Sequence, residues 1–380
     1  MNKKIYLLIF FLAAIFTIHG QNKSVPMALV NCNQLLYAPG DYGSANWRIP
    51  AILALPDGTL IVANDKRKFN EADLPEDIDI LVRRSLPSAN AQRAWEEPVV
   101  VAQGTGFKQG FGDPGLVQTA EGDILCMFVG GNGFWKSNEE DPQRTYVSRS
   151  TDSGKSWGTP IDITSLLWGG KAENPLCRRY KGSFCASGNG LRLTRGPHAG
   201  RVMFVAAMCR VSHYVADNFV VYSDDNGATW HVSDLAFRGG DEAKVVQLVD
   251  GRILMSVRQN GARGYNISED GGATWGDQGN WPEMTTNACN GDMIRYSSVD
   301  EGGERNILIH SIPNSMQREN VSLFVSYDEG KTWHDPLTLH AGPSVYSSLT
   351  RLPDGTIGIY LEKNDEGPCS LWYMNISFPW

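Results

Sequence analysis

The chain has 380 residues and a formal net charge of −8, with 34 Lys and Arg against 42 Asp and Glu. An acidic chain is not expected to bind nucleic acid or an anionic membrane surface, and it binds an anionic ligand only where its cations gather in one pocket. With 40 glycines, 11 tryptophans and little helical periodicity, the sequence favours an all-β protein with many tight turns.

The first twenty residues carry the pattern of a secretory signal peptide. Lys3 and Lys4 precede an almost continuously apolar run over residues 5–18, and the chain turns polar after Gly20. A run of about 14 apolar residues is short for a membrane span, so we prefer a cleaved signal to the alternative, a membrane anchor. We therefore expect residues 1–20 to be removed, residues 21–380 to form a single domain, and the protein to be secreted or periplasmic.

The seven cysteines show no spacing typical of a metal site, and we expect neither a metal nor another cofactor. An oxidising compartment permits disulfides, and Cys177 and Cys185 are close enough in sequence to bridge a surface loop. Free buried thiols explain the same residues equally well. The sequence leaves both alternatives open.

Two repeats run through the rest of the chain. A turn of the form polar-Gly-polar, followed by apolar residues, occurs six times at intervals of roughly 50 to 80 residues, centred on Gly58, Gly122, Gly200, Gly251, Gly303 and Gly355. One interval accommodates about four short strands, which is the size of a propeller blade. The sequence therefore predicts a six-bladed β-propeller, with residues 29–36 pairing into the blade that contains residues 355–360 to close the ring.

The second repeat is Ser-x-Asp-x-Gly-x-(Thr/Ser)-Trp, which we call the Asp box. It begins at Ser150, Ser223, Ser268 and Ser326, and a degenerate form runs from Ser85 to Trp95. We expect the aspartate to accept backbone N–H bonds within a hairpin, the glycine to take a positive φ and the tryptophan to pack into the blade core. These aspartates are predicted to be structural and not catalytic.

A family resemblance emerges when the Asp boxes are taken together with Trp47-Arg48-Ile49-Pro50, which precedes the first turn. Arg-Ile-Pro before the first blade of an Asp-box propeller resembles the bacterial sialidases, also called neuraminidases, of glycoside hydrolase family 33. The resemblance covers essentially the whole chain after the predicted signal. It implies a retaining exo-α-sialidase that cleaves terminal sialic acid from glycoproteins, gangliosides and oligosaccharides and that acts as a monomer.

The resemblance also implies an arginine clamp for the carboxylate of sialic acid. Its three members fall on Arg48, Arg258 and Arg318. Arginine suits this role because its planar guanidinium donates two hydrogen bonds to a carboxylate and stays charged at any working pH. Two further substrate-binding positions, Arg67 and Asp113, match family residues near the O4 hydroxyl of the sugar.

Three residues match the family's reacting groups: Tyr346 as nucleophile, Glu242 as its base and Asp73 as general acid/base. A neutral phenol avoids the repulsion that an anionic nucleophile meets at a carbon bearing a carboxylate, about 4 kcal/mol at 4 Å and an effective dielectric of 20. Because a phenol is a weak nucleophile, a base has to take its proton as it attacks. Asp77 and Asp79 are rivals to Asp73, although the sequence after residue 77 is typical of a strand.

Other functions remain open on the same residues. A trans-sialidase, or a sialidase that forms an anhydro sugar, would keep every reacting group and differ in acceptor-site residues that one sequence does not reveal. A sialic-acid-binding propeller without activity would keep the arginine clamp and lose Asp73, Glu242 or Tyr346. All three are present, so we prefer the hydrolase.

Overall fold

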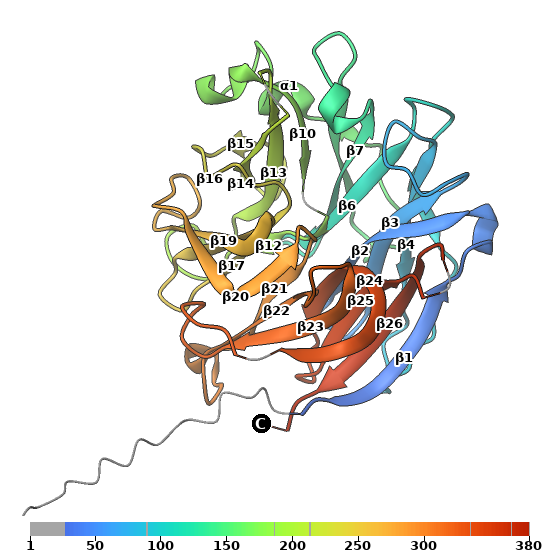
Figure 1. Cartoon of the computed structure of the whole chain (residues 1–380), viewed down its shortest axis with the longest axis vertical. Coiled ribbons are helices and arrows are strands. Elements are labelled where there is room, and N and C mark those ends of the chain that lie inside the picture. The colour runs from blue at the N-terminus through green and yellow to red at the C-terminus, as the bar shows by residue number, and fades with distance from the viewer. Residues whose placement is uncertain are drawn as a thin grey trace, which may run out of the picture.

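The strands of the protein are grouped around a central channel, and Figure 1 shows these groups fanned about it. The computed structural model describes residues 27–379 apart from residues 89, 186, 213, 335 and 366. The predicted signal peptide, residues 1–20, lies outside the described residues. Most neighbours within a group are antiparallel strands that follow one another in the chain, which is the arrangement of a propeller blade.

Blades 1 to 3 occupy the first part of the chain. Blade 1 contains β2 (Asn46–Ala54), β3 (Leu60–Arg67), β4 (Ile78–Arg84) and β5 (Val99–Ala102). Blade 2 contains β6 (Phe111–Gln118), β7 (Ile124–Gly131), β8 (Gln143–Ser150) and β9 (Ile161–Asp162). Blade 3 contains β10 (Tyr180–Cys185), β12 (Leu191–Arg192), β13 (Val202–Arg210), β14 (Ala216–Ser223), β15 (His231–Val232) and β16 (Phe237–Arg238).

Blades 4 to 6 follow, and one long strand joins the last two. Blade 4 contains β17 (Ala243–Gln247), β18 (Ile253–Val257), β19 (Asn260–Ser268) and β20 (Gly279–Asn287). Blade 5 contains β21 (Asp292–Ser297), β22 (Ile307–Pro313), β23 (Glu319–Ser326) and the first half of β24 (Leu337–Arg351). Blade 6 contains the second half of β24, then β25 (Ile357–Lys363), β26 (Ser370–Ser377) and β1 (Leu29–Tyr37). The short helical segments are α1 (Thr164–Leu167), η1 (Asp41–Gly43), η2 (Phe134–Lys136), η3 (Pro175–Arg179) and η4 (Val299–Glu301).

The predicted ring closure is confirmed. β1 pairs antiparallel with β26, with Leu29 opposite Ser377 and Tyr37 opposite Leu371. Figure 1 shows the blue N-terminal strand lying beside the red C-terminal strands. The two ends of the described chain therefore share one sheet, and the predicted six-bladed propeller is the observed fold. Each of the six predicted glycine turns joins the first and second strands of its blade.

One short strand departs from the blade pattern. β11 (Gly188–Asn189) interrupts the inner strand of blade 3 and pairs in parallel with β6 of blade 2. It also contacts the inner strands β2 and β24 of blades 1 and 6. β11 therefore lies within the channel, among the inner strands of blades 1, 2 and 6.

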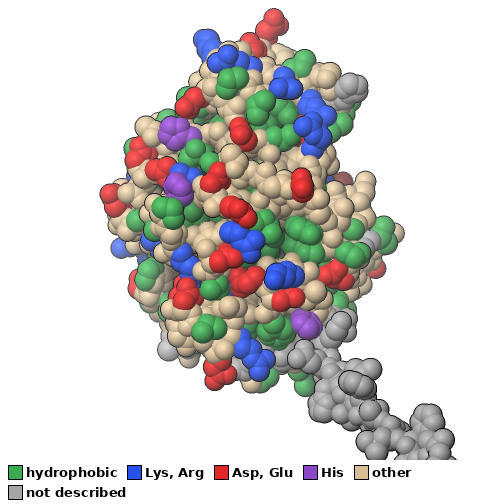
Figure 2. Space-filling view, turned by 90° about the vertical axis from the view of Figure 1, so that its left-hand side faces the viewer, with side chains coloured by type: hydrophobic (Ala, Val, Ile, Leu, Met, Phe, Trp, Pro, Cys, Tyr) green, Lys and Arg blue, Asp and Glu red, His purple; other side chains and the backbone are tan. Residues whose placement is uncertain are grey.

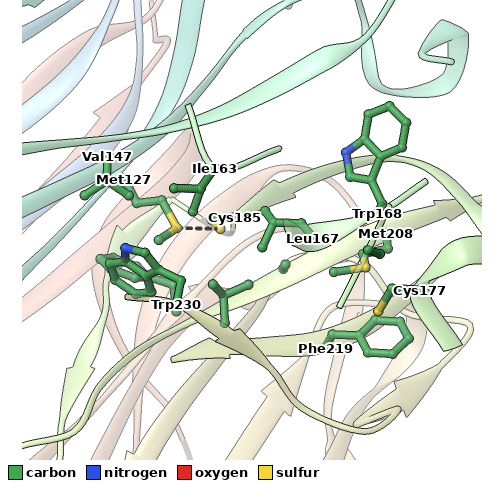
Figure 3. Packing of buried hydrophobic residues seen from close by; sticks show 14 of the residues in the cluster. Met127, Val147, Ile163, Leu167, Trp168, Cys177, Cys185, Met208, Phe219 and Trp230 are labelled. Atoms are coloured by element: carbon green, nitrogen blue, oxygen red, sulfur yellow. Dashed lines mark hydrogen bonds between the residues drawn. The ribbon is translucent and has the colours of Figure 1, made fainter. Parts of the chain in front are cut away.

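The hydrophobic core lies in the seams between neighbouring blades. One cluster joins blades 2 and 3 through buried residues that include Met127, Val147, Met208, Phe219 and Trp230 (Figure 3). The tryptophans of the four complete Asp boxes each pack in the seam with the preceding blade, and not within the core of their own blade as predicted; these are Trp157, Trp230, Trp275 and Trp333. The Asp box therefore fastens one blade to the next.

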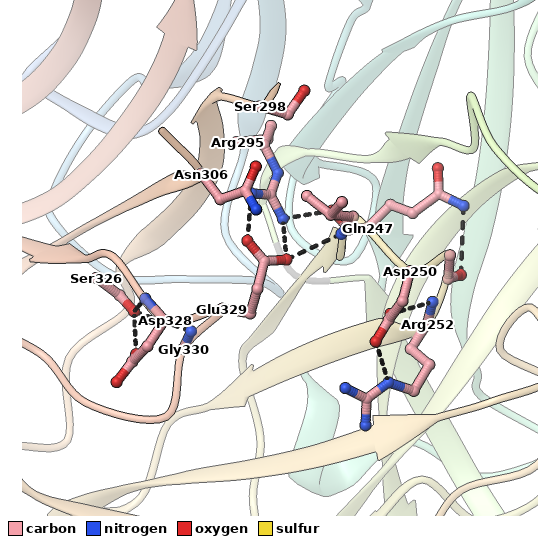
Figure 4. Close-up of polar contacts among 12 residues, drawn as sticks. Gln247, Asp250, Arg252, Arg295, Ser298, Asn306, Ser326, Asp328, Glu329 and Gly330 are labelled. Atoms are coloured by element: carbon pink, nitrogen blue, oxygen red, sulfur yellow. Dashed lines mark hydrogen bonds and ion pairs between the residues drawn. The ribbon is translucent and has the colours of Figure 1, made fainter. Parts of the chain in front are cut away.

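The hydrogen bonds of the Asp boxes agree with the predicted structural role. In the first complete box, Asp152 accepts from the amide of Ser156 at 2.9 Å, and Gly154 has a φ of 84°. Hydrogen bonds from Ser156 lower the pKa of Asp152 to about 2, so this carboxyl is a permanent acceptor. In the last box, Glu329 forms two contacts of 2.6 Å with Arg295, beside Ser326 and Asp328 (Figure 4).

Figure 2 shows Lys and Arg interspersed with Asp and Glu on the side that faces left in Figure 1, without a block of one sign. All seven cysteines are free and six of them are buried, which selects the thiol alternative. Within the described residues no helix is long and apolar enough to cross a membrane.

Candidate active site

The predicted site residues gather at one end of the channel. Arg48, Asp113 and Tyr346 lie near the starts of the inner strands of blades 1, 2 and 6, and Glu242 directly precedes the inner strand of blade 4. The six glycine turns follow the other ends of the inner strands. The site and the turns therefore occupy opposite faces of the propeller.

Irregular backbone at the strand starts directs these side chains into the channel. The β2–β3 pairing is interrupted between Arg48 and Ala51, and Ile49 adopts a φ of 63°. The β6–β7 pairing is interrupted around Asp113, whose φ is 59°, and the β24–β25 pairing is interrupted around Tyr346. A bulge re-aims the side chain it carries, and a left-handed β-branched residue such as Ile49 is a true outlier. The strain observed in Arg-Ile-Pro therefore coincides with the site.

Tyr346 and Glu242 form the centre of the site. The Tyr346 hydroxyl donates to Glu242 Oε2 at 2.7 Å, and both residues are buried, with exposed fractions of 7% and 3%. Arg258 Nη1 contacts the same two oxygen atoms, at 2.8 Å from the hydroxyl. Burial and the Glu242 charge raise the pKa of Tyr346 well above its usual value, although Arg258 lowers it. The phenol therefore keeps its proton until the adjacent carboxylate takes it.

The three predicted clamp arginines surround the ring of Tyr346. The guanidinium carbon of Arg48 lies 5.2 Å from the ring centroid and that of Arg318 lies 5.8 Å from it, while Arg258 bonds the hydroxyl. Arg48 pairs with Glu362, and Arg258 pairs with Asp241 and Glu242. Arg318 has no acidic partner within the described residues and donates to the Ala288 carbonyl at 3.3 Å. Its charge is available to an anionic ligand.

Sequence reasoning missed Glu362, which hydrogen-bonds two of the site residues, Arg48 and Tyr346. Its carboxylate is fully buried and accepts from Arg48 Nε at 2.8 Å, from the Ile49 amide at 2.6 Å and from the Tyr346 amide at 3.0 Å. It thereby fixes the first arginine against the tyrosine. The available signal was an acidic residue inside the apolar strand β25, because a buried carboxylate requires a charged or hydrogen-bonding partner.

Asp73 lies on the loop between β3 and β4 and pairs with Arg67 at 2.6 Å. Its side chain is 80% exposed, at the open rim of the site. Partial desolvation by the surrounding walls raises its pKa, but the charges of Arg67 and Arg48 outweigh that effect and lower it. The rivals Asp77 and Asp79 lie within 2.9 Å of Lys68 instead. Of these three aspartates, Asp73 is the one with an accessible carboxylate.

Asp113 and Asp65 lie beneath this loop. Asp65 accepts from Arg67 at 3.0 Å and from the Asp113 amide at 3.0 Å. Burial raises the pKa of Asp65 to about 6, even though Arg67 lowers it. Burial also raises the pKa of Asp113, as do the charges of Asp65 and Asp73, so its neutral form is favoured. Asp113 is thus placed to offer a hydrogen to a ligand hydroxyl group.

In the described residues no group of three or more His, Cys, Asp or Glu is arranged to hold a metal ion. The chemistry at this end of the channel comes from one phenol, several carboxylates and four arginines. Such a set suits an anionic ligand that is held by cations and attacked by an oxygen nucleophile.

Comparison with known proteins identifies the class. The family profile of the BNR repeat-like domain matches residues 69–359. The chain is 33% identical to a sialidase of Micromonospora viridifaciens over 91% of its own length and 54% of the relative, and 26% identical to a sialidase of Bacteroides fragilis over 86% and 61%. The chain belongs to the sialidase family of BNR-repeat proteins.

A solved structure shares the fold. The Hadza microbial sialidase Hz136 superposes with a TM-score of 0.78 and 24% sequence identity over 90% of this chain and 68% of that chain. At this identity the likeness establishes the propeller and not the reaction. The chain spans about half to three fifths of the length of the two curated relatives.

Proposed function

We propose that the protein is a retaining exo-α-sialidase that hydrolyses terminal sialic acid from glycoproteins, gangliosides and oligosaccharides through a covalent tyrosyl intermediate. The observation that carries this proposal is the 2.7 Å hydrogen bond between buried Tyr346 and Glu242, with three arginines around the same ring. A phenol, its base and an anion clamp in one pocket support attack by an oxygen nucleophile on an anionic sugar. The sequence of residues 1–20 supports action outside the cytoplasm, by a domain over residues 21–380.

The first step forms the intermediate. The Tyr346 oxygen attacks the anomeric carbon while the bond from that carbon to the leaving oxygen breaks. Glu242 takes the phenolic proton, and Asp73 gives a proton to the leaving oxygen. The clamp arginines bind the carboxylate of the sugar. Its negative charge then offsets the positive charge that these arginines exert on Asp73. Because those charges lower the pKa of Asp73 in the empty site, substrate binding shifts it toward the protonated form that the step requires.

The second step reverses the first with water. Asp73 takes a proton from a water molecule, whose oxygen attacks the anomeric carbon. The bond to Tyr346 breaks, and its oxygen recovers the proton held by Glu242. Two inversions at one carbon give net retention.

Time-resolved NMR on sialyllactose tests the proposed reaction. The first product is expected to be the α-anomer of free sialic acid, which then equilibrates in solution. An initial β-anomer would contradict retention. A new sialoside, formed when excess lactose is present, would establish transfer, and an anhydro sugar would establish intramolecular attack. Running the two sialyllactose isomers side by side also gives the linkage preference.

Arg318→Ala is expected to raise KM about 10- to 100-fold and to change kcat much less. The carboxylate is held in the ground state and in the transition state alike, and a charge-assisted contact is worth about 1.5–3 kcal/mol. Steady-state kinetics on sialyllactose measure both constants. Arg305→Ala is the matched control, because Arg305 is an exposed arginine on the Gly303 turn of the same blade. A fall in kcat with KM unchanged would show that Arg318 does not clamp the substrate.

A further inference from the structure

A buried lysine, Lys244, lies close in the chain to Glu242 of the Tyr346–Glu242 pair. Lys244 lies on β17, two residues after Glu242, which directly precedes the strand. The Arg258 amide donates to the Glu242 carbonyl at 2.8 Å and so continues the β17–β18 ladder through Glu242, which places the two side chains on the same side. Lys244 is 2% exposed, and its ammonium contacts the Ser187 carbonyl and lies 3.4 Å from Asn290 Oδ1. It forms no ion pair with any described carboxylate. A buried ammonium bonded to neutral groups alone is costly, and the two reaction steps do not use it.

A glycine of β11 leaves room for the Lys244 side chain. A Cβ added at Gly188 of β11 would lie 3.0 Å from Lys244 Cε, and Gly188 has a φ of 105°. Asp292, on the inner strand of blade 5, lies nearby but bonds to neutral donors such as Ser348 Oγ at 2.9 Å and the Leu349 amide at 2.8 Å. Burial lowers the pKa of Lys244, whereas the charges of Asp292 and Glu242 raise it. The Lys244 ammonium thus interacts electrostatically with two carboxylates without forming an ion pair with either.

A second buried cation lies on the same face of blade 4. Arg263 is 2% exposed; its Nε donates to Ser256 Oγ at 2.7 Å, and its Nη1 donates to the Cys289 carbonyl at 2.9 Å. Ser256 stands opposite Lys244 in the β17–β18 pairing. Arg263 also forms no ion pair within the described residues, and burial lowers its pKa to about 10 although the Glu242 charge raises it. Two cations therefore share one carboxylate, Glu242, as a neighbour.

Lys244 and Arg263 differ from the three clamp arginines in their position. Arg258 bonds Glu242 directly, but in the proposed reaction it also binds the substrate carboxylate, so its charge is shared once the substrate arrives. Lys244 and Arg263 are too deeply buried to reach a ligand. Their field at Glu242 is undiminished in the complex, and it acts in a low-dielectric interior where charges interact strongly.

From this arrangement we infer that Lys244, assisted by Arg263, is a positioning residue whose charge stabilises the Glu242 carboxylate while the substrate carboxylate is bound, so that Glu242 accepts the Tyr346 proton. The inference rests on the proposed function and extends it. The ionisable groups that interact with Glu242 come from six strands or their ends: Asp241 and Lys244 beside or on β17, Arg258 after β18, Arg263 on β19, Cys289 before β21, Asp113 on β6 and Tyr346 on β24. Of these, only Lys244 and Arg263 are fully buried cations.

Lys244→Met tests the inference through the pH dependence of kcat/KM on an aryl sialoside. The phenol of such a substrate leaves with little protonation, so the acid limb reports ionisation of the coupled Glu242–Tyr346 pair. Losing the cation is expected to move that limb upward by about one pH unit or more, and so to lower kcat/KM about tenfold or more at pH values on the acid side of the wild-type limb. Lys244→Arg keeps the charge and is expected to keep the wild-type limb.

Two further variants make the result decisive. Lys363→Met removes a comparably buried lysine that lies over Trp372 in blade 6, and it is expected to leave the limb in place. Asn290→Asp puts a carboxylate beside the Lys244 ammonium without removing it, and it is expected to raise the limb even if Lys244→Met does not fold. A wild-type acid limb in folded Lys244→Met or in Asn290→Asp would overturn the inference. An inactive wild-type protein would instead overturn the proposed function.

Discussion

Tyr346→Phe is expected to fold like the wild type and to lose turnover by roughly 10³-fold or more, because only the attacking oxygen is removed. The ring packs in a small buried cluster with Ile49, Cys289 and Cys369, and those contacts do not involve the hydroxyl. Glu242 keeps its bond to Arg258 in the variant, so no buried charge is left unpaired. Circular dichroism and thermal unfolding would report the fold, and release of sialic acid from sialyllactose would report turnover.

Tyr360→Phe is the matched control for that substitution. Tyr360 is fully buried, and its hydroxyl donates one hydrogen bond of 2.8 Å to Asn64, away from the reacting groups. Loss of this hydrogen bond is expected to lower the free energy of unfolding by about 1 kcal/mol and to leave kcat within about twofold of the wild-type value. If Tyr346→Phe retained wild-type turnover, the nucleophile would have to be another residue.

Asp73→Ala is expected to be selective for the leaving group. With sialyllactose, whose leaving alcohol needs a proton, kcat/KM should fall about 10²- to 10⁴-fold, the usual contribution of a general acid. With an aryl sialoside it should fall less than about tenfold. Asp77→Ala, which removes the Lys68 partner on the same loop, should show no such selectivity. Equal losses on the two substrates would remove Asp73 from the role of acid.

The pH dependence of the same substrate pair follows from the environment of Asp73. Because Arg67 and Arg48 lower its pKa in the empty site, overcoming partial desolvation, the protonated form becomes scarce as the pH rises. For wild-type enzyme, kcat/KM on sialyllactose should therefore increase as the pH falls toward the pKa of Asp73. With the aryl sialoside, kcat/KM should not show this increase. In Asp73→Ala, kcat/KM should not show it with either substrate.

The blade architecture could be predicted because its signals are local. Each glycine turn and each Asp box specifies a hairpin with residues only a few positions apart, as the 2.9 Å bond from Ser156 to Asp152 illustrates. Counting the turns then gave the number of blades, and the pairing of residues 29–37 with β26 closed the ring as expected. The seam position of the Asp-box tryptophans was missed, since a repeat does not reveal which neighbour a side chain meets.

The site was accessible only in part. Arg48, Asp73, Glu242, Arg258, Arg318 and Tyr346 were placed by resemblance to a family, and the structure brings them to one end of the channel. Glu362 and Lys244 were missed because their roles depend on partners far away in the sequence: Glu362 bonds Arg48 across 314 positions, and Lys244 contacts Ser187 across 57. Glu362 and Lys244 stand out because they are charged and buried, and a sequence motif does not show which residues are buried.

Covalent labelling tests the tyrosine nucleophile most directly. A 3-fluorinated sialosyl fluoride forms the intermediate quickly and releases it slowly, since fluorine beside the anomeric centre destabilises the positive charge that develops when the intermediate breaks down. Peptide mass spectrometry after incubation is expected to find the sugar on Tyr346, and to find no adduct in Tyr346→Phe. An adduct on Glu242 or Asp73 would contradict a tyrosine nucleophile, and so would an active wild-type enzyme that carries no label.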